Sequence, residues 1–249
     1  MKLLWIILFS LFAGNSVSGI GLKAMSFKVN YVSNDTLQTW KYRKDEVINL
    51  IKQNSPDIFC IQQVLVSHIN DIASQIPGID WVGAGRDDGI SKGEYAPIFY
   101  NAQRFQLKQH GIFWLSDTPD SPSPSGICTY ACFEDYETRE NFQIFNTHFT
   151  ELLINEESAV RLIIEKINEL SVKEIPVLLT GDFTSSKKDF TIRYLKRRLD
   201  YIDGSDRNDS DKFNYIFINK RFEISNYLIL DTPSSVYPEI HWPVYIETL

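Results

Sequence analysis

The stretch PVLLTGDFT, residues 176–184, decides the fold of this chain. Residues 176–180 are almost entirely apolar, which is typical of a strand whose two faces are both covered. Gly181 ends this run and Asp182 follows it, so the strand carries a carboxylate to its carboxyl end. A strand of this kind requires neighbouring strands and covering layers, which points to packed β-sheets.

Comparable hydrophobic patterns run through the rest of the chain. Alternating or fully apolar patterns predict strands over residues 22–32, 57–63, 94–100, 105–115, 126–135, 141–147, 176–180, 215–218, 222–230 and 244–248. Apolar residues three and four positions apart predict helices over residues 42–54, 65–76, 155–170 and 190–199. Asn155, followed by Glu156 and Glu157, is a favourable helix start. Helices distributed among antiparallel and mixed strands predict two packed sheets covered by helices.

The composition is that of one folded domain. The chain has 249 residues, of which 43% are hydrophobic and 23% charged, enough for one layered core. Its formal net charge of -7 argues against broad capture of nucleic acid, because such binding depends on Lys and Arg displacing counterions. The densest cationic run is interpreted as a solvated helix face, with a local binding patch as the alternative. This run comprises Lys187, Lys188, Arg193, Lys196, Arg197 and Arg198.

The amino-terminal segment has the three parts of a secretory signal. Lys2 precedes an apolar run over residues 3–13, and the small residues Ser18 and Gly19 follow. We therefore expect cleavage after Ser18 or Gly19, a single domain over residues 20–249, and a secreted protein, extracellular or periplasmic in a bacterium. An amino-terminal membrane anchor is the alternative, although the apolar run is short for a bilayer span. No transmembrane segment is expected after cleavage.

The chain carries few of the covalent features of a secreted protein. Cys60, Cys128 and Cys132 are too few, and odd in number, for a disulfide framework. Cys60 lies in an apolar run and is expected to be buried. Asn34 and Asn208 match the N-glycosylation pattern, which matters only on a secretory route that glycosylates.

A series of short motifs follows a definite order along the chain. The longest are WVG with GRDDG, over residues 81–89, and GEYAPIFY, over residues 93–100. The others are MSF at 25–27, Trp40 with Arg43, DIF at 57–59, FWLS at 113–116, NTH at 146–148 and LTGDF at 179–183. In these motifs the sequence resembles the endonuclease/exonuclease/phosphatase superfamily. That group includes pancreatic-type deoxyribonuclease, neutral sphingomyelinases, inositol-polyphosphate 5-phosphatases and poly(A) deadenylases.

The resemblance covers almost the whole of residues 20–249 and implies both a fold and a site. The implied fold class is α/β (α+β), a four-layer αββα sandwich of two mixed β-sheets flanked by helices. The implied site lies at one edge of the sandwich, where loops converge. Cleavage of a phosphoric ester there requires a divalent cation, a base for the attacking water and donors for the developing charge.

The resemblance identifies four retained catalytic positions and five substituted ones. His148, Asp182 and His241 match catalytic residues, and Glu94 matches the carboxylate that orients the first histidine. The substituted positions are Lys28 for an Asn, Gln63 for the metal-binding Glu, Thr184 for an Asn, Asn214 for the Asp before Tyr-Ile, and Ile240 for the Asp before the second histidine. A glutamine offers a carbonyl oxygen without charge, a poor exchange for a hard cation.

Two features leave alternatives open. Lys28 is in the position that contacts phosphate in the family, and it either pairs with Asp182 as a buried stand-in for the cation or extends to solvent. Arg86, Asp87 and Asp88 lie in a loop bounded by glycines, where they either form a turn or contact substrate at the rim.

The sequence therefore predicts a secreted protein of this fold that is a catalytically impaired or inactive pseudoenzyme. We expect it to be a monomer that binds a phosphorylated, sugar-containing or protein ligand in the old cleft, with no metal and no other cofactor. The alternative is an active phosphodiesterase or phosphatase with an altered site that depends on Mg²⁺ or Mn²⁺. Substrate choice lies in loops that diverge freely, so the ligand is not identified by the sequence.

Overall fold

The computed structural model describes residues 20–29, 40–150, 155–171, 175–183, 190–201, 214–219, 221–230 and 242–249. Its helices are α1 (Trp40–Asn54), α2 (Val66–Gln75), α3 (Glu156–Leu170) and α4 (Phe190–Lys196). Its strands are β1 (Lys23–Lys28), β2 (Ile58–Gln62), β3 (Ile79–Val82), β4 (Ile98–Asn101), β5 (Phe105–Trp114), β6 (Gly126–Asp135), β7 (Asn141–Phe149), β8 (Val177–Asp182), β9 (Asp200–Tyr201), β10 (Asn214–Ile218), β11 (Ile224–Ile229) and β12 (Val244–Thr248).

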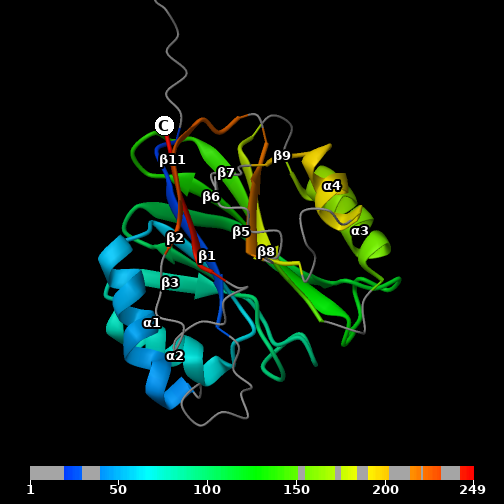
Figure 1. Ribbon diagram of the computed structural model, residues 1–249, viewed down its shortest axis with the longest axis horizontal. Helices are drawn as coiled ribbons and strands as arrows, with labels where there is room; N and C mark the ends of the chain where they lie inside the picture. Colours follow the sequence, from blue (N-terminus) through cyan, green and yellow to red (C-terminus); the bar gives the residue numbers. More distant parts are fainter. Residues whose placement is uncertain are drawn as a thin grey trace, which may run out of the picture.

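The strands form two mixed sheets that face each other. The first sheet has the order β11-β12-β1-β2-β4-β3, and the second has the order β5-β6-β7-β8-β10-β9. The β1–β2 and β7–β8 pairs are parallel, whereas β12 and β10 run antiparallel to their neighbours β1 and β8. Helices α1 and α2 cover the outer face of the first sheet, and α3 and α4 cover that of the second (Figure 1). The predicted four-layer αββα sandwich is confirmed.

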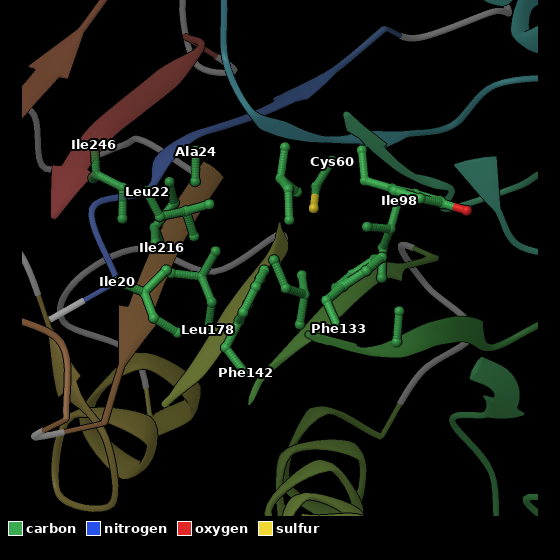
Figure 2. Close-up of a cluster of buried hydrophobic side chains, with 14 of the residues drawn as sticks. Ile20, Leu22, Ala24, Cys60, Ile98, Phe133, Phe142, Leu178, Ile216 and Ile246 are labelled. Carbon is green, nitrogen blue, oxygen red and sulfur yellow. The ribbon is translucent and has the colours of Figure 1, made fainter. Parts of the chain in front are cut away.

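The inner core fills the space between the two sheets. Ala24, Cys60 and Ile98 of the first sheet face the same buried cluster as Phe142 and Leu178 of the second (Figure 2). All five side chains are almost fully buried. Because alternate residues of a strand point to opposite faces, each of these strands supplies one row to this core and another to the helical layer.

The outer cores lie between each sheet and its helices. On the first sheet, Val47 and Ile51 of α1 and Ile72 of α2 pack with Phe27 and Phe59. On the second sheet, the buried stripe of α3 consists of Ala159, Val160, Ile163, Ile164 and Ile167. The three- and four-residue spacing of these stripes is what keeps each helix flat against its sheet.

Most sequence-predicted elements agree with the structure to within a few residues, and the exceptions have local causes. Strand β3, Ile79–Val82, is missing from the prediction because it is a short edge strand with only one buried residue. The strand predicted over 94–100 begins only at Ile98. Before it, Tyr95 pairs with Val64 in an isolated bridge that ends a loop. Of the strand predicted over 22–32, β1 covers Lys23–Lys28, and residues from 30 lie outside the described ranges.

Several smaller predictions are also decided. The Asn155 side chain accepts a hydrogen bond from the Ser158 backbone at 3.2 Å, so the helix start is confirmed. Cys60, Cys128 and Cys132 are all free thiols, as expected. The residues of the cationic run that the structure describes, 193 and 196–198, are exposed, which agrees with a solvated face. Lys187, Lys188, Asn34 and Asn208 lie outside the described residues.

Among the described helices, none has the length and apolar character that crossing a membrane requires.

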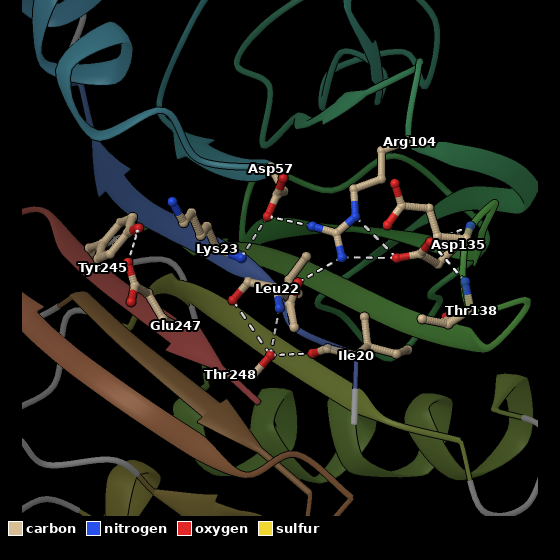
Figure 3. Close-up of polar contacts among 12 residues, drawn as sticks. Ile20, Leu22, Lys23, Asp57, Arg104, Asp135, Thr138, Tyr245, Glu247 and Thr248 are labelled. Carbon is tan, nitrogen blue, oxygen red and sulfur yellow. Dashed lines mark hydrogen bonds and ion pairs between the residues drawn. The ribbon is translucent and has the colours of Figure 1, made fainter. Parts of the chain in front are cut away.

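A cluster of polar side chains, which includes Arg104, Asp57, Asp135 and Thr248, joins several strands at the end of the sandwich where β1 begins (Figure 3). Arg104 contacts Asp57 at 2.8 Å and Asp135 at 2.9 Å, and donates to the Gly21 carbonyl at 2.6 Å. Asp135 is fully buried. The Thr248 hydroxyl donates to the Ile20 carbonyl and accepts from the Leu22 backbone, which ties the first described residues to the last strand.

We predict that Arg104→Met lowers the free energy of unfolding by about 3 kcal/mol, because it leaves the buried Asp135 carboxylate without its charged partner. Arg139→Met is the matched control, since Arg139 pairs with Glu134 but its side chain is 67% exposed. That change should cost less than about 1 kcal/mol. Urea unfolding of both variants measures the difference, and equal losses would contradict a special role for the buried pair.

Candidate functional site

The candidate site is built on a row of side chains at the ends of neighbouring strands. His148 on β7 is in register with Asp182 on β8, and Asp182 is in register with Asn214 on β10. Residues paired across neighbouring strands point to the same face of a sheet, so these three share the face that looks toward the first sheet. Lys28, at the end of β1, belongs to that first sheet. The topology thus brings residues far apart in sequence to one edge.

A buried ion pair connects the two sheets at this edge. Lys28 Nζ lies 2.8 Å from Asp182 Oδ2, and the two side chains are 8% and 0% exposed. The hypothesis that Lys28 pairs with Asp182 is confirmed, and the alternative that Lys28 extends to solvent is wrong. The physical reason is that Asp182 sits at the end of a fully buried strand, where its charge requires a close positive partner.

A second group of contacts connects Asp182 to His148, and His148 to Glu94. The imidazole Nε2 lies 3.8 Å from Asp182 Oδ2, and Nδ1 lies 3.2 Å from Glu94 Oε2. Arg86 Nη1 reaches the same Glu94 oxygen at 3.1 Å and also donates to the Thr150 hydroxyl at 3.2 Å. The imidazole of His148 therefore lies between two carboxylates, and a lysine and an arginine lie beyond them on either side. The expected pairing of His148 with Glu94 is present.

The environment of Glu94 favours its ionised form. Burial raises the pKa of the Glu94 carboxyl, but hydrogen bonding and charge interaction with His148 outweigh burial. The charge of Arg86 and a hydrogen bond from the Gln63 side chain act in the same direction. The net effect is a pKa below the ordinary glutamate range, so Glu94 stays a carboxylate that holds and orients the imidazole.

The loop between β3 and β4 presents Arg86 to Glu94. Trp114 donates its indole N–H to the Arg86 carbonyl at 2.6 Å, and Arg86 Nε donates to Asp87 at 3.1 Å. Asp88 Oδ1 accepts the backbone N–H groups of residues 90, 91 and 92 at 2.8 to 2.9 Å. These bonds, that of Lys92 first, lower the pKa of the Asp88 carboxyl. This geometry agrees with turn-making for Asp88, and substrate contact by the loop stays a prediction.

Gln63 lies next to this cluster in an unusual backbone conformation. Its φ of 56° lies in the left-handed region, which residues other than glycine seldom adopt. Such conformations are retained where the surroundings hold them, and functional sites are common among those places. The Gln63 side-chain oxygen is buried and has no hydrogen-bond partner among the residues that the structure describes.

A hydrogen-bonded network beside the site was missed by sequence reasoning. Gln62 Nε2 donates to Asn146 Oδ1 at 2.7 Å and to Ser26 Oγ at 3.1 Å, so it links the two sheets. Asn146 donates in turn to the carbonyls of Ile61 and Pro97 at 2.9 and 2.8 Å. The available signal was the presence of polar amides inside otherwise apolar strand runs, since buried amides require partners.

The remaining predicted site residues divide into two groups. Asn214 is fully buried, and within the described ranges neither polar atom of its side chain has a hydrogen-bond partner. Thr184, Ile240 and His241 lie outside the described residues. Their positions relative to Asp182 therefore stay predictions.

Among the described residues, the groups around Asp182 are poorly suited to a divalent cation. In the described part of the chain, no group of three or more His, Cys, Asp or Glu side chains is placed to hold a metal ion. The carboxylate that is present, Asp182, already has an ammonium at 2.8 Å, and a second positive charge there would be repelled. Gln63 adds an uncharged oxygen only.

Comparison with solved structures identifies the class of protein. An endonuclease/exonuclease/phosphatase from Bacteroides vulgatus superposes with a TM-score of 0.80 at 29% identity, covering 92% of this chain and 98% of that one. A mannosyl-6-phosphatase from Bacteroides thetaiotaomicron gives 0.79 at 26% identity, with 92% and 99% covered. The human Nocturnin catalytic domain gives 0.74 at 18% identity, with 92% and 94% covered. The fold of this chain is therefore that of the endonuclease/exonuclease/phosphatase structures.

Sequence comparison finds similar proteins in a virus. Uncharacterized protein L388 of Acanthamoeba polyphaga mimivirus is 26% identical over 196 residues, which is 73% of each chain. Uncharacterized protein R895 of the same virus is 29% identical over 100 residues, and the match covers 14% of its length. No protein-family model matches the chain.

We predict that Lys28→Ala lowers the free energy of unfolding by about 3 kcal/mol, because the buried Asp182 carboxylate would lose the ammonium that lies 2.8 Å from it. Lys23→Ala is the matched control, since Lys23 is exposed on the same strand. Its loss should stay within about 0.5 kcal/mol. Urea unfolding at neutral pH checks both, and a loss below about 0.5 kcal/mol for Lys28→Ala is incompatible with a structural role for the pair.

Proposed function

We propose that this protein is a secreted, monomeric, catalytically impaired or inactive member of the superfamily, which binds a phosphorylated, sugar-containing or protein ligand in the old cleft. The observation that carries the proposal is the ion pair between Lys28 and Asp182 at 2.8 Å. In this pair, Asp182, the acid retained at the metal position, neutralises the buried charge of Lys28. The carboxylate then has no free charge with which to recruit a cation for hydrolysis.

The other substitutions support the same conclusion. The sequence replaces a metal-binding Glu by Gln63, a second acid by Asn214 and a third by Ile240. Single losses of an acid, base or oxyanion donor cost factors of roughly 100 to 1000 in rate. Losses at one centre do not multiply freely, but together they leave no ordinary hydrolase.

The ligand class is supported by what the scaffold keeps. Arg86 and His148 remain held at the cluster by Glu94, and both can contact an anion. One solved structure of similar sequence is a mannosyl-6-phosphatase. Mannose 6-phosphate, compared with mannose and with inorganic phosphate, is therefore the first ligand to test by calorimetric titration.

A second candidate is an active, metal-dependent phosphodiesterase or phosphatase with an altered site. It is favoured by the intact Glu94–His148 pair, which an unused site has no evident need to preserve. In that case the cation would be Mg²⁺ or Mn²⁺ and would have to displace Lys28 from Asp182.

We predict that the chain from residue 20 onward binds magnesium poorly, because Gln63 lacks the charge of the usual ligand and Lys28 neutralises Asp182. Isothermal titration with MgCl₂ and MnCl₂ measures this. Saturable binding with a dissociation constant near or below about 0.1 mM, lost in Asp182→Ala, would support the enzyme alternative instead.

A further prediction tests whether the substituted groups account for the inactivity. Restoring the family residues should rebuild a cation site on strands that are already in place, and magnesium-dependent hydrolysis of bis-p-nitrophenyl phosphate should appear. The substitutions are Lys28→Asn, Gln63→Glu, Thr184→Asn, Asn214→Asp and Ile240→Asp.

The parent chain is the control for this restoration and should be inactive. If it hydrolyses this ester, or a panel of phosphomonoesters, in a reaction that needs metal and vanishes with His241→Ala, the pseudoenzyme proposal is wrong.

A further inference from the structure

A cavity of about 590 Å³ lies between the loop after β5, residues 115–125, and the first half of α3, residues 155–165. None of the residues around the Lys28–Asp182 pair lines it. We propose that this cavity is a second binding site, for a small organic cation that carries ammonium groups on a short methylene chain, such as a diamine or polyamine. The proposal goes beyond the proposed function and does not rest on it.

Both walls of this cavity are held in place by the fold. The backbone N–H of Trp114 donates to the Pro119 carbonyl at 2.9 Å, which folds the loop back against the end of β5. The backbone N–H of Thr150 donates to the Ser125 carbonyl at 3.1 Å and fixes the other end of the loop. The opposite wall is a helix whose buried stripe packs on the second sheet. Binding in such a preformed cavity requires little ordering of the protein.

The cavity has an apolar base. Leu115 and Ala159 line it but are only 3% and 2% exposed, because both belong to the core beneath α3. Pro119 and Leu162, which are half-buried, extend this apolar surface. A methylene chain that covers such a surface removes apolar area from water on both sides of the contact, which favours binding.

The polar part of the lining is rich in hydrogen-bond acceptors. It includes the hydroxyl groups of Ser116, Ser125 and Ser158 and the carboxylates of Asp117 and Glu165. The loop supplies the first carboxylate and α3 supplies the second, so acceptors stand on both walls. An ammonium group has three N–H donors and no acceptor, and it therefore matches a lining of this kind.

The balance of charge selects a cation over an anion. Among the described residues that line the cavity, Arg161 is the one cation. Its guanidinium is already engaged, since Nε and Nη2 donate to Glu157 Oε1 at 3.2 and 2.7 Å and Cζ lies 5.0 Å from the centre of the Tyr194 ring. Within the described ranges, neither Asp117 nor Glu165 forms an ion pair. The two carboxylates therefore attract an ammonium and repel a phosphate.

The test is calorimetric titration of the purified protein with putrescine and with spermidine at low salt. We expect saturable binding with a dissociation constant of about 1 mM or tighter. Asp117→Asn and Glu165→Gln should each weaken it by about fivefold, because ion pairs that are partly open to water are modest, and together by about twentyfold. Asp120→Asn and Glu137→Gln are the matched controls. They remove the same charge from exposed side chains outside the cavity, and should change binding by less than about twofold.

Two calorimetric results would overturn the proposal. One is the absence of saturable binding of either amine by the parent up to about 10 mM. The other is an equal loss of binding in the control variants, which would show a general attraction to a chain of net charge -7.

A third measurement needs no variant. Spermidine should shift the amide NMR signals of residues 115–125 and 155–165 in the parent, whereas mannose and inorganic phosphate should leave them in place. Spermidine shifts confined to Glu94, His148 and Asp182 would contradict the proposal, as would shifts of the cavity residues by phosphate. Mannose 6-phosphate is read out at the old cleft, so failure of the proposed function is recognised separately.

Discussion

A carboxylate enclosed between two β-sheets must have a positive partner, and this constraint governs the functional edge of the molecule. Asp182 is 0% exposed, and its partner Lys28 comes from the opposite sheet. Neutralising the charge and docking the two sheets are therefore the same event. From this pair, a chain of polar contacts continues through His148 and Glu94 to Arg86. Because this ion pair joins the two sheets, the presence of Lys28 in the site affects the assembly of the whole sandwich as well as the site itself.

The layered fold and part of the site could be predicted from sequence, because both depend on local patterns. Apolar runs and helical stripes predict the strands and helices, and burying each apolar face requires four layers. Motif order predicts that Glu94, His148 and Asp182 converge, and the distances of 3.2 Å and 3.8 Å confirm that they do. A short edge strand, Ile79–Val82, escaped prediction because one buried residue gives too weak a pattern.

The remaining features depend on contacts between sheets, which no single strand encodes. The direction of Lys28 is decided by what lies opposite it on β8, so sequence left two alternatives open. The Gln62–Asn146 bond of 2.7 Å joins β2 to β7 and requires their relative placement. Gln63, with its left-handed φ of 56°, lies between the end of β2 and Val64, which forms a bridge with Tyr95. Sequence supplies such residues as candidates, and tertiary structure alone assigns their partners.

The pairing of β1 with β12 has a consequence for folding. Lys23 is in register with Glu247, so this pair joins strands that are far apart in sequence, whereas β5, β6 and β7 pair with their neighbours along the chain. The cost of closing so long a loop falls on the first sheet alone. Until β12 is in place, one side of β1 remains an unpaired edge, the kind of surface that chaperones protect.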